Sequence, residues 1–243
     1  MKQINKKVLL VIFFLLLAII LMAGAFKICA VQTAAGGCET VPKIVIDPGH
    51  GGADGGAVGI DGLHEKDVNL EVSLKLRDIL ILNGYDVIMT RNEDCSIHDN
   101  GINGLKAQKT SDMHNRLKIM KENPDAVFVS IHQNKFEEES SWGTQVFYSQ
   151  NNKESQQLAQ IIQDNTICFI QPENHRKIKQ AENNLFLLYN AEIPAVMIEC
   201  GFISNRAECA KLQTEDYQNQ LSYVIFYSIN EFLKLCSQPS TAV

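Results

Sequence analysis

Basic clusters, which would indicate a nucleic-acid-binding protein, are missing from most of this sequence. Of its 243 residues, 22 are Lys or Arg and 28 are Asp or Glu, so the formal charge is −6. No group of basic residues occurs beyond the N-terminus. Because proteins that bind nucleic acid usually carry a basic patch or stripe, we expect no nucleic-acid partner.

The sequence also lacks the cysteine spacing of a cysteine-rich metal site. It has seven cysteines, an odd number, and no two of them form a Cys-x-x-Cys pair. This argues against a zinc site built from thiolates. Disulfide bonds remain open from the sequence, although a chain of this length can fold on its hydrophobic core alone. Internal repeats are absent as well, which favours one folded domain.

One long hydrophobic run is present, at the N-terminus. Three lysines precede the unbroken apolar segment Val8–Phe26, and Lys27 follows it. About 20 apolar residues cross a bilayer as a helix, and flanking lysines favour the cytoplasmic side. We expect residues 1–27 to anchor the chain in a membrane, with the rest outside the cytoplasm. Ala23–Ala25 also resembles a signal-peptide cleavage site, in which case the protein would be secreted.

The remaining chain divides into a linker (28–42), a catalytic domain (43–237) and a short tail (238–243). Within the domain, apolar runs typical of buried strands alternate with amphipathic helical segments, which predicts a single-domain α/β fold. Its sheet should be mostly parallel and twisted, with helices on both faces. The expected strands are 43–47, 85–91, 126–131, 144–149 and 195–199, and the expected helices are 67–82, 112–122, 153–169 and 216–236.

Reactive residues follow three of the predicted strands. His50 follows the first strand, His132 the strand at 126–131, and Glu199 the last one. Ligands of open α/β sheets bind at the carboxyl ends of strands, and the glycine-rich stretch after His50 allows Glu65 to return beside it. Catalytic zinc takes three protein ligands and keeps one open position. Two histidines and Glu65 supply such a set, which would also suit iron or manganese, and Glu199 remains as a free carboxylate.

Four blocks in this order resemble the zinc-dependent N-acetylmuramoyl-L-alanine amidases of bacteria. They are IDPGHGGADGGAVG, HEKDVNLEVSLKLRDILILNGYDVIMTR, SIHQN and PAVMIECGFISN, and the resemblance extends from Lys43 to about Leu235. It implies zinc bound by His50, Glu65 and His132, with Glu199 as the catalytic carboxylate. The expected reaction is hydrolysis of the amide bond between the lactyl group of muramic acid and L-alanine in peptidoglycan.

Within this family, the short chain without wall-binding repeats is most similar to the germination-specific type of endospore formers. That resemblance implies action on the spore cortex, where peptide removal precedes formation of muramic-δ-lactam. A vegetative cell-wall autolysin, a zinc peptidase that cuts within the stem peptide, and a catalytically silent wall-binding protein are the alternatives. The expected partners are peptidoglycan, the membrane and an activator protein.

Three residues near these blocks have less specific predictions. We expect His64 to face solvent and Arg116 to have a structural role. Asp47 is expected to cap or orient a loop, with a contact to His50 as the other possibility.

Overall fold

The structure is a computed structural model that describes residues 41–237. The predicted membrane segment (1–27), nearly all of the predicted linker and the tail at 238–243 lie outside the described residues and stay predictions. Between residues 41 and 237, no helix combines the length and hydropathy needed to cross a membrane.

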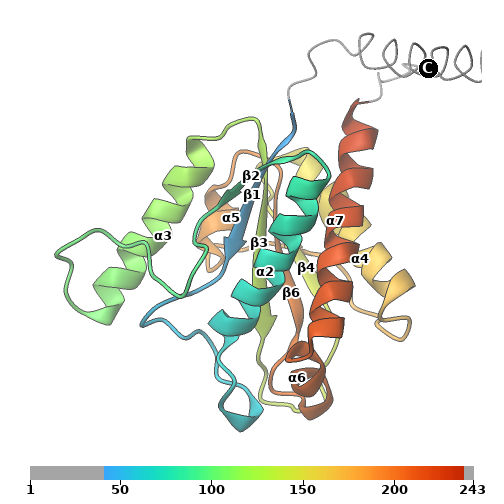
Figure 1. Cartoon of the computed structure of the whole chain (residues 1–243), viewed down its shortest axis with the longest axis horizontal. Helices are drawn as coiled ribbons and strands as arrows, with labels where there is room; N and C mark the ends of the chain where they lie inside the picture. The colour runs from blue at the N-terminus through green and yellow to red at the C-terminus, as the bar shows by residue number, and fades with distance from the viewer. Residues whose placement is uncertain (1–40, 238–243) are drawn as a thin grey trace, which may run out of the picture. The chain divides into compact units, whose positions relative to one another are not determined.

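One six-stranded sheet forms the centre of the described domain, in the strand order β2-β1-β3-β6-β4-β5 (Figure 1). The strands β1, β2, β3 and β6 pair in parallel. The strands are β1 (Lys43–Pro48), β2 (Asp86–Met89), β3 (Ala126–Asn134), β4 (Gln145–Tyr148), β5 (Lys179–Gln180) and β6 (Ala195–Phe202).

The prediction of a mostly parallel sheet holds for these four strands, but the whole sheet is mixed. β4 runs antiparallel to β6, and β5 pairs in parallel with β4. A parallel connection needs a crossover, usually a helix. The chain between β3 and β4 contains no helix, so β4 returns in the opposite direction.

Helices cover both faces of the sheet, as predicted. α2, α4 and α7 pack together on one face, whereas α3 and α5 lie on the other (Figure 1). The helices are α2 (Glu65–Leu82), α3 (Leu105–Lys121), α4 (Lys153–Phe169), α5 (Phe186–Asn190), α6 (Arg206–Leu212) and α7 (Glu215–Ser237), and a 3-10 turn, η1, spans Ile60–Gly62.

Alternation along the central strands explains the two-sided packing. Successive side chains of a strand point to opposite faces, so strands buried on both sides consist of continuous apolar runs. In β1, Ile44 and Ile46 join the core beneath α2, α4 and α7, whereas Val45 joins the core beneath α3 and α5. All three side chains are fully buried.

The main helix boundary that differs from the prediction is the start of α3. We predicted a helix over 112–122, but α3 begins at Leu105. Its first turns are polar and mostly exposed to solvent, so they have no apolar periodicity to indicate a helix. The short elements η1, β5, α5 and α6 were also not predicted, because so few residues give no periodic signal.

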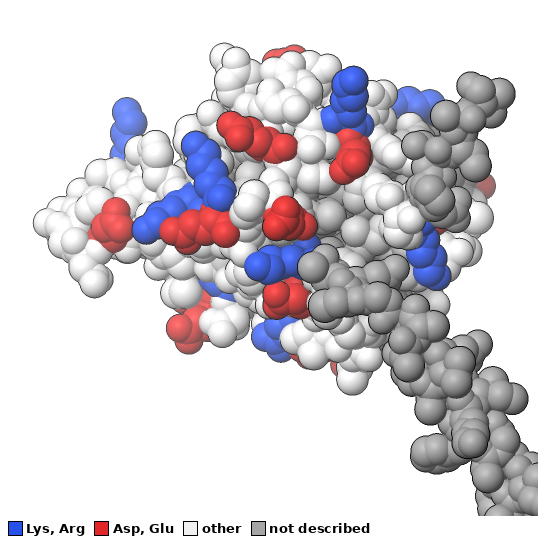
Figure 2. All heavy atoms as spheres, turned by 90° about the horizontal axis from the view of Figure 1, so that it is seen from above, with Lys and Arg blue, Asp and Glu red and all other residues white. Residues whose placement is uncertain are grey.

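Basic and acidic side chains are interspersed on the face of the described domain that Figure 2 shows. That face therefore presents no broad field of one sign.

Candidate active site

Two of the predicted residues are direct neighbours at the carboxyl edge of the sheet. His132 of β3 is paired with Glu199 of β6 in the parallel ladder. Residues opposite each other on paired strands point to the same face of the sheet. The fold therefore brings an imidazole and a carboxylate together at the edge where α/β sheets bind ligands.

His50 reaches the same edge from the turn after β1. Its φ is +62°, a left-handed conformation, and the backbone N–H of Gly49 bonds to β3 at 3.0 Å. A Cβ atom at Gly49 would lie 2.2 Å from the ring of His132, so this approach requires glycine. Nδ1 of His50 lies 2.9 Å from Oδ2 of Asp54. Its Nε2 faces Glu65 at 3.2 Å.

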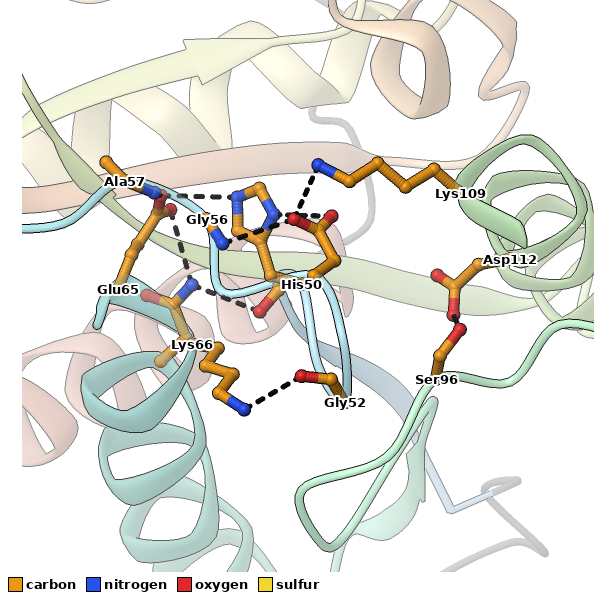
Figure 3. A network of polar contacts seen from close by, with 12 residues as sticks. His50, Gly52, Gly56, Ala57, Glu65, Lys66, Ser96, Lys109 and Asp112 are labelled. Atoms are coloured by element: carbon orange, nitrogen blue, oxygen red, sulfur yellow. Dashed lines mark hydrogen bonds and ion pairs between the residues drawn. The ribbon is translucent and has the colours of Figure 1, made fainter. Parts of the chain in front are cut away.

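Glu65 is the first residue of α2 and is 4% exposed. Its Oε2 accepts a hydrogen bond from the backbone N–H of Ala57 at 2.9 Å. Its Oε1 accepts bonds from Nδ2 of Asn69 at 3.3 Å and from the backbone N–H of Gln133 at 3.2 Å. Nδ1 of His132 lies 2.8 Å from the same oxygen. Donors from three segments thus fix the carboxylate, which points toward His50 in Figure 3.

The three predicted ligands form one cluster that could hold a metal ion. One ligand atom from each of His50, Glu65 and His132 lies within 4.8 Å of the other two. The two imidazole rings are 5.0 Å apart and nearly perpendicular, at 75°. Tetrahedral ligation at about 2.0–2.1 Å separates ligand atoms by roughly 3.3 Å. The cluster is therefore close to the size that one small divalent cation requires.

The histidines and carboxylates of this cluster shift each other's pKa values in opposite directions. Burial alone would lower the pKa of His50, but the carboxylates of Asp54 and Glu65 raise it to about 9. Burial alone would raise the pKa of Glu65, but His132 and His50 hold it far below its ordinary value. Both shifts arise because opposite charges and hydrogen bonds outweigh desolvation.

Glu199 lies beside the cluster and lacks a hydrogen-bond partner. Its Oε2 is buried and makes no hydrogen bond to any described residue. Burial raises its pKa to about 7; the charge of Glu65 adds to this shift, whereas His132 and His50 oppose it. A buried carboxylate oxygen without a partner is costly, and a raised pKa beside a cluster of possible metal ligands is typical of a functional group.

A model of the N-acetylmuramoyl-L-alanine amidase family matches residues 44–231. The chain belongs to this family. The germination-specific N-acetylmuramoyl-L-alanine amidase of Bacillus subtilis (strain 168) is 37% identical over 186 residues, which cover 76% of this chain and 77% of that protein. The protein is therefore an N-acetylmuramoyl-L-alanine amidase, a hydrolase of peptidoglycan.

Solved amidase structures share the fold. The CwlD amidase of Clostridioides difficile, in complex with the GerS lipoprotein, is 35% identical with a TM-score of 0.77, over 80% of this chain and 99% of that one. The catalytic domain of CwlV from Bacillus (Paenibacillus) polymyxa var. colistinus is 30% identical with a TM-score of 0.66, again over 80% and 99%.

A buried ion-pair network supports the turn of the amidase that carries His50. Arg116 of α3 is 2% exposed, and its guanidinium contacts the carboxylates of Asp47 and Asp112 at 2.5 Å each. It also donates to the backbone oxygens of Pro48 at 2.8 Å and His50 at 2.7 Å. The predicted structural role of Arg116 is confirmed.

Asp47 orients the turn through Arg116 rather than by a contact with the ring of His50. Its other hydrogen bonds come from Thr90 and Ser130, each at 2.7 Å. The carboxylate that holds the His50 ring is Asp54, which the sequence analysis missed. The sequence feature that could have indicated Asp54 is its position four residues after His50 in the same glycine-rich block. His64 is exposed, as predicted.

Proposed function

We propose that this amidase is zinc-dependent and hydrolyses the amide bond between the lactyl group of muramic acid and L-alanine in spore-cortex peptidoglycan. The observation that carries the proposal is the convergence of His50, Glu65 and His132 beside Glu199, a half-buried residue whose buried Oε2 has no hydrogen-bond partner among the described residues. Three ligands and one free carboxylate match the requirements of hydrolytic zinc chemistry.

The ligand set supports zinc by its chemistry and by its supporting contacts. Nε2 of His50, the carboxylate of Glu65 and a ring nitrogen of His132 would hold the ion. Metal-binding histidines commonly donate their other N–H to a carboxylate, and Asp54 occupies that place for His50. When bound, zinc polarises a carbonyl group and acidifies water.

Glu199 is the proton carrier in this proposal. Its carboxylate accepts a proton as a water oxygen bonds to the lactyl carbonyl carbon. It then gives the proton to the nitrogen of L-alanine as the C–N bond breaks, so the peptide leaves as an amine. Proton transfer of this kind contributes about 10²–10⁴-fold to rates. The missing hydrogen-bond partner of Oε2 leaves the carboxylate available for this role.

The proposal that spore-cortex peptidoglycan is the substrate rests on the similarity to two relatives. The Bacillus subtilis relative is named germination-specific, and the CwlD structure has nearly the same length as the matched region. Vegetative peptidoglycan is the alternative within the same chemistry. Cleavage within the stem peptide is a further alternative that the family match disfavours.

Localisation and an activator form part of the same proposal. Residues 1–27 would anchor the amidase, with the catalytic domain outside the cytoplasm on the cell-wall side or around the developing spore; cleavage of that segment would release it. The CwlD structure is a complex with a lipoprotein. By analogy, we propose that a lipoprotein activates this amidase.

The proposal is tested by incubating the full-length protein and zinc with purified cortex peptidoglycan and, separately, with vegetative peptidoglycan. Products are identified by mass spectrometry. We expect peptides with a free L-alanine amine and glycan with bare lactyl groups, and faster release from cortex. Equal rates would remove the cortex assignment, and cuts inside the stem peptide would reassign the enzyme as a peptidase.

A further inference from the structure

A cavity of about 410 Å³ opens beside His50 and His132 and extends between α3 and α5. Much of its wall is apolar, formed by Leu105, Met113, Leu185, Phe186, Leu187 and Met197. Pockets that are mainly apolar with a few placed polar groups are typical ligand sites. Because His50 and His132 of the ligand cluster line this cavity, it is the candidate space for part of a substrate bound at the cluster.

Lys109 is the accessible cation of the cavity wall. Arg116, the other basic side chain there besides the histidines, is 2% exposed and paired with Asp47 and Asp112. The Lys109 side chain is 46% exposed, and its Nζ contacts Oδ1 of Asp54 at 2.7 Å. It makes no other ion pair or hydrogen bond within residues 41–237. An ammonium has three N–H donors, so two of them remain available to a ligand.

Lys109 also lies at a defined place relative to His50. Asp54 contacts Lys109 through one carboxylate oxygen and His50 through the other, at 2.7 and 2.9 Å. Figure 3 shows the Lys109 side chain reaching from α3 toward His50. An extended peptide advances about 3.3–3.6 Å per residue. A peptide that leaves the ligand cluster toward α3 would therefore bring its second residue near Nζ.

We propose that Lys109 binds the free carboxylate of the stem-peptide residue that follows L-alanine, and so makes the enzyme selective for peptides that are acidic there. The proposal rests on the proposed function, because it places the amide of L-alanine at the ligand cluster. One N–H of Lys109 stays on Asp54, and a second donates to the substrate. The apolar wall of the cavity would face the rest of the peptide.

The test compares two synthetic muramoyl tripeptides, in which the residue after L-alanine is linked to the third residue through its side-chain carboxyl group. This residue is D-glutamate in one peptide, with a free α-carboxylate, and D-isoglutamine in the other, in which the α-carboxylate is an amide. Full-length, zinc-loaded protein is assayed as wild type, Lys109→Gln, Lys109→Arg and Lys106→Gln. Lys106 is the matched control, because it is an exposed lysine of α3 that does not line the cavity. The readouts are kcat/KM for each substrate and the zinc content of each variant.

For the wild type, we expect kcat/KM to be roughly tenfold higher with D-glutamate, the effect of one hydrogen bond to a charged group. Lys109→Gln should abolish this preference while keeping its zinc, and Lys109→Arg and Lys106→Gln should retain it. An unchanged preference in Lys109→Gln overturns the proposal. Equal losses with both substrates together with lost zinc also overturn it, and would assign Lys109 to positioning Asp54. If the wild type hydrolyses intact peptidoglycan but neither synthetic peptide, the proposal for Lys109 fails, whereas inactivity on peptidoglycan as well would contradict the proposed function itself.

Discussion

At the scale of single residues, Asn69 provides a test of how the ligand cluster is supported. It is fully buried on α2, one turn after Glu65, and its Nδ2 donates to Oε1 of Glu65 and to the backbone oxygen of Gly49. It therefore connects one predicted ligand with the turn that carries His50.

We predict that Asn69→Ala weakens zinc binding by about 10–100-fold, the usual effect of losing a residue that orients a metal ligand. Zinc affinity is measured by competition with a chromogenic chelator. The control is Asn83→Ala, because Asn83 is exposed at the end of the same helix and contacts only helix backbone. Unchanged affinity in Asn69→Ala would show that Glu65 does not depend on this bond.

The positions of the candidate site residues were predictable from sequence, whereas their supporting contacts were not. His132 and Glu199 follow apolar strand runs, and the rule that parallel strands end together places them side by side. Asn69 and Asp54 have no comparable signal. Whether a polar side chain in a glycine-rich loop or on a helix contacts the site depends on the path of the backbone, which short sequence patterns do not determine.

At the scale of elements, the ion pairs of Arg116 join α3 to the end of β1. Burial would raise the pKa of Asp47, but Arg116 and the hydrogen bonds from Ser130 and Thr90 hold it below its ordinary value. A lowered pKa in the folded state stabilises the protein above the unfolded-state pKa, about 3.9 for Asp. This contribution is lost as the pH falls below that value toward the folded-state pKa.

We predict that Asp47→Asn lowers the free energy of unfolding at pH 7 by about 3–5 kcal/mol, because it leaves Arg116 with one buried partner fewer. The difference from wild type should narrow as the pH falls below about 4, because the unfolded wild-type chain then binds a proton at Asp47 that the folded protein does not yet bind. Urea unfolding at several pH values measures both effects. Asp78→Asn is the control, since Asp78 is exposed. A difference that stays constant with pH would refute the account of Asp47.

The predicted helices and strands agree with the structure where hydrophobic periodicity is strong. They differ where a helix begins with polar turns or where the length of a connection decides the direction of a strand. The long amphipathic segments became α2, α4 and α7 close to the predicted limits. The sequence did not indicate the first turns of α3, because these turns are mostly polar and exposed and so have no apolar periodicity. The direction of β4 follows from its connection to β3, so the strand pattern itself did not reveal it.

At the scale of the whole molecule, the candidate metal site formed by His50, Glu65 and His132 lies at one edge of the sheet, outside the two hydrophobic cores. We therefore predict that a chelator abolishes amidase turnover while the circular dichroism of the folded protein persists. Zinc at about 100 times its Kd stabilises the fold by about 2.7 kcal/mol, so its removal should lower Tm by roughly 5–10 °C. Adding zinc back should restore both properties. Full turnover after complete metal removal would contradict a metal-dependent mechanism.

The central claim is that one folded domain places a three-ligand metal cluster and a separate proton-carrying carboxylate at the same strand ends. The most direct test measures zinc content and peptidoglycan turnover in Glu199→Gln, with Glu192→Gln as the control because Glu192 is exposed away from the site. We predict that Glu199→Gln keeps its zinc and loses about 10²–10⁴-fold in kcat. Wild-type turnover in a zinc-loaded Glu199→Gln protein would contradict the claim.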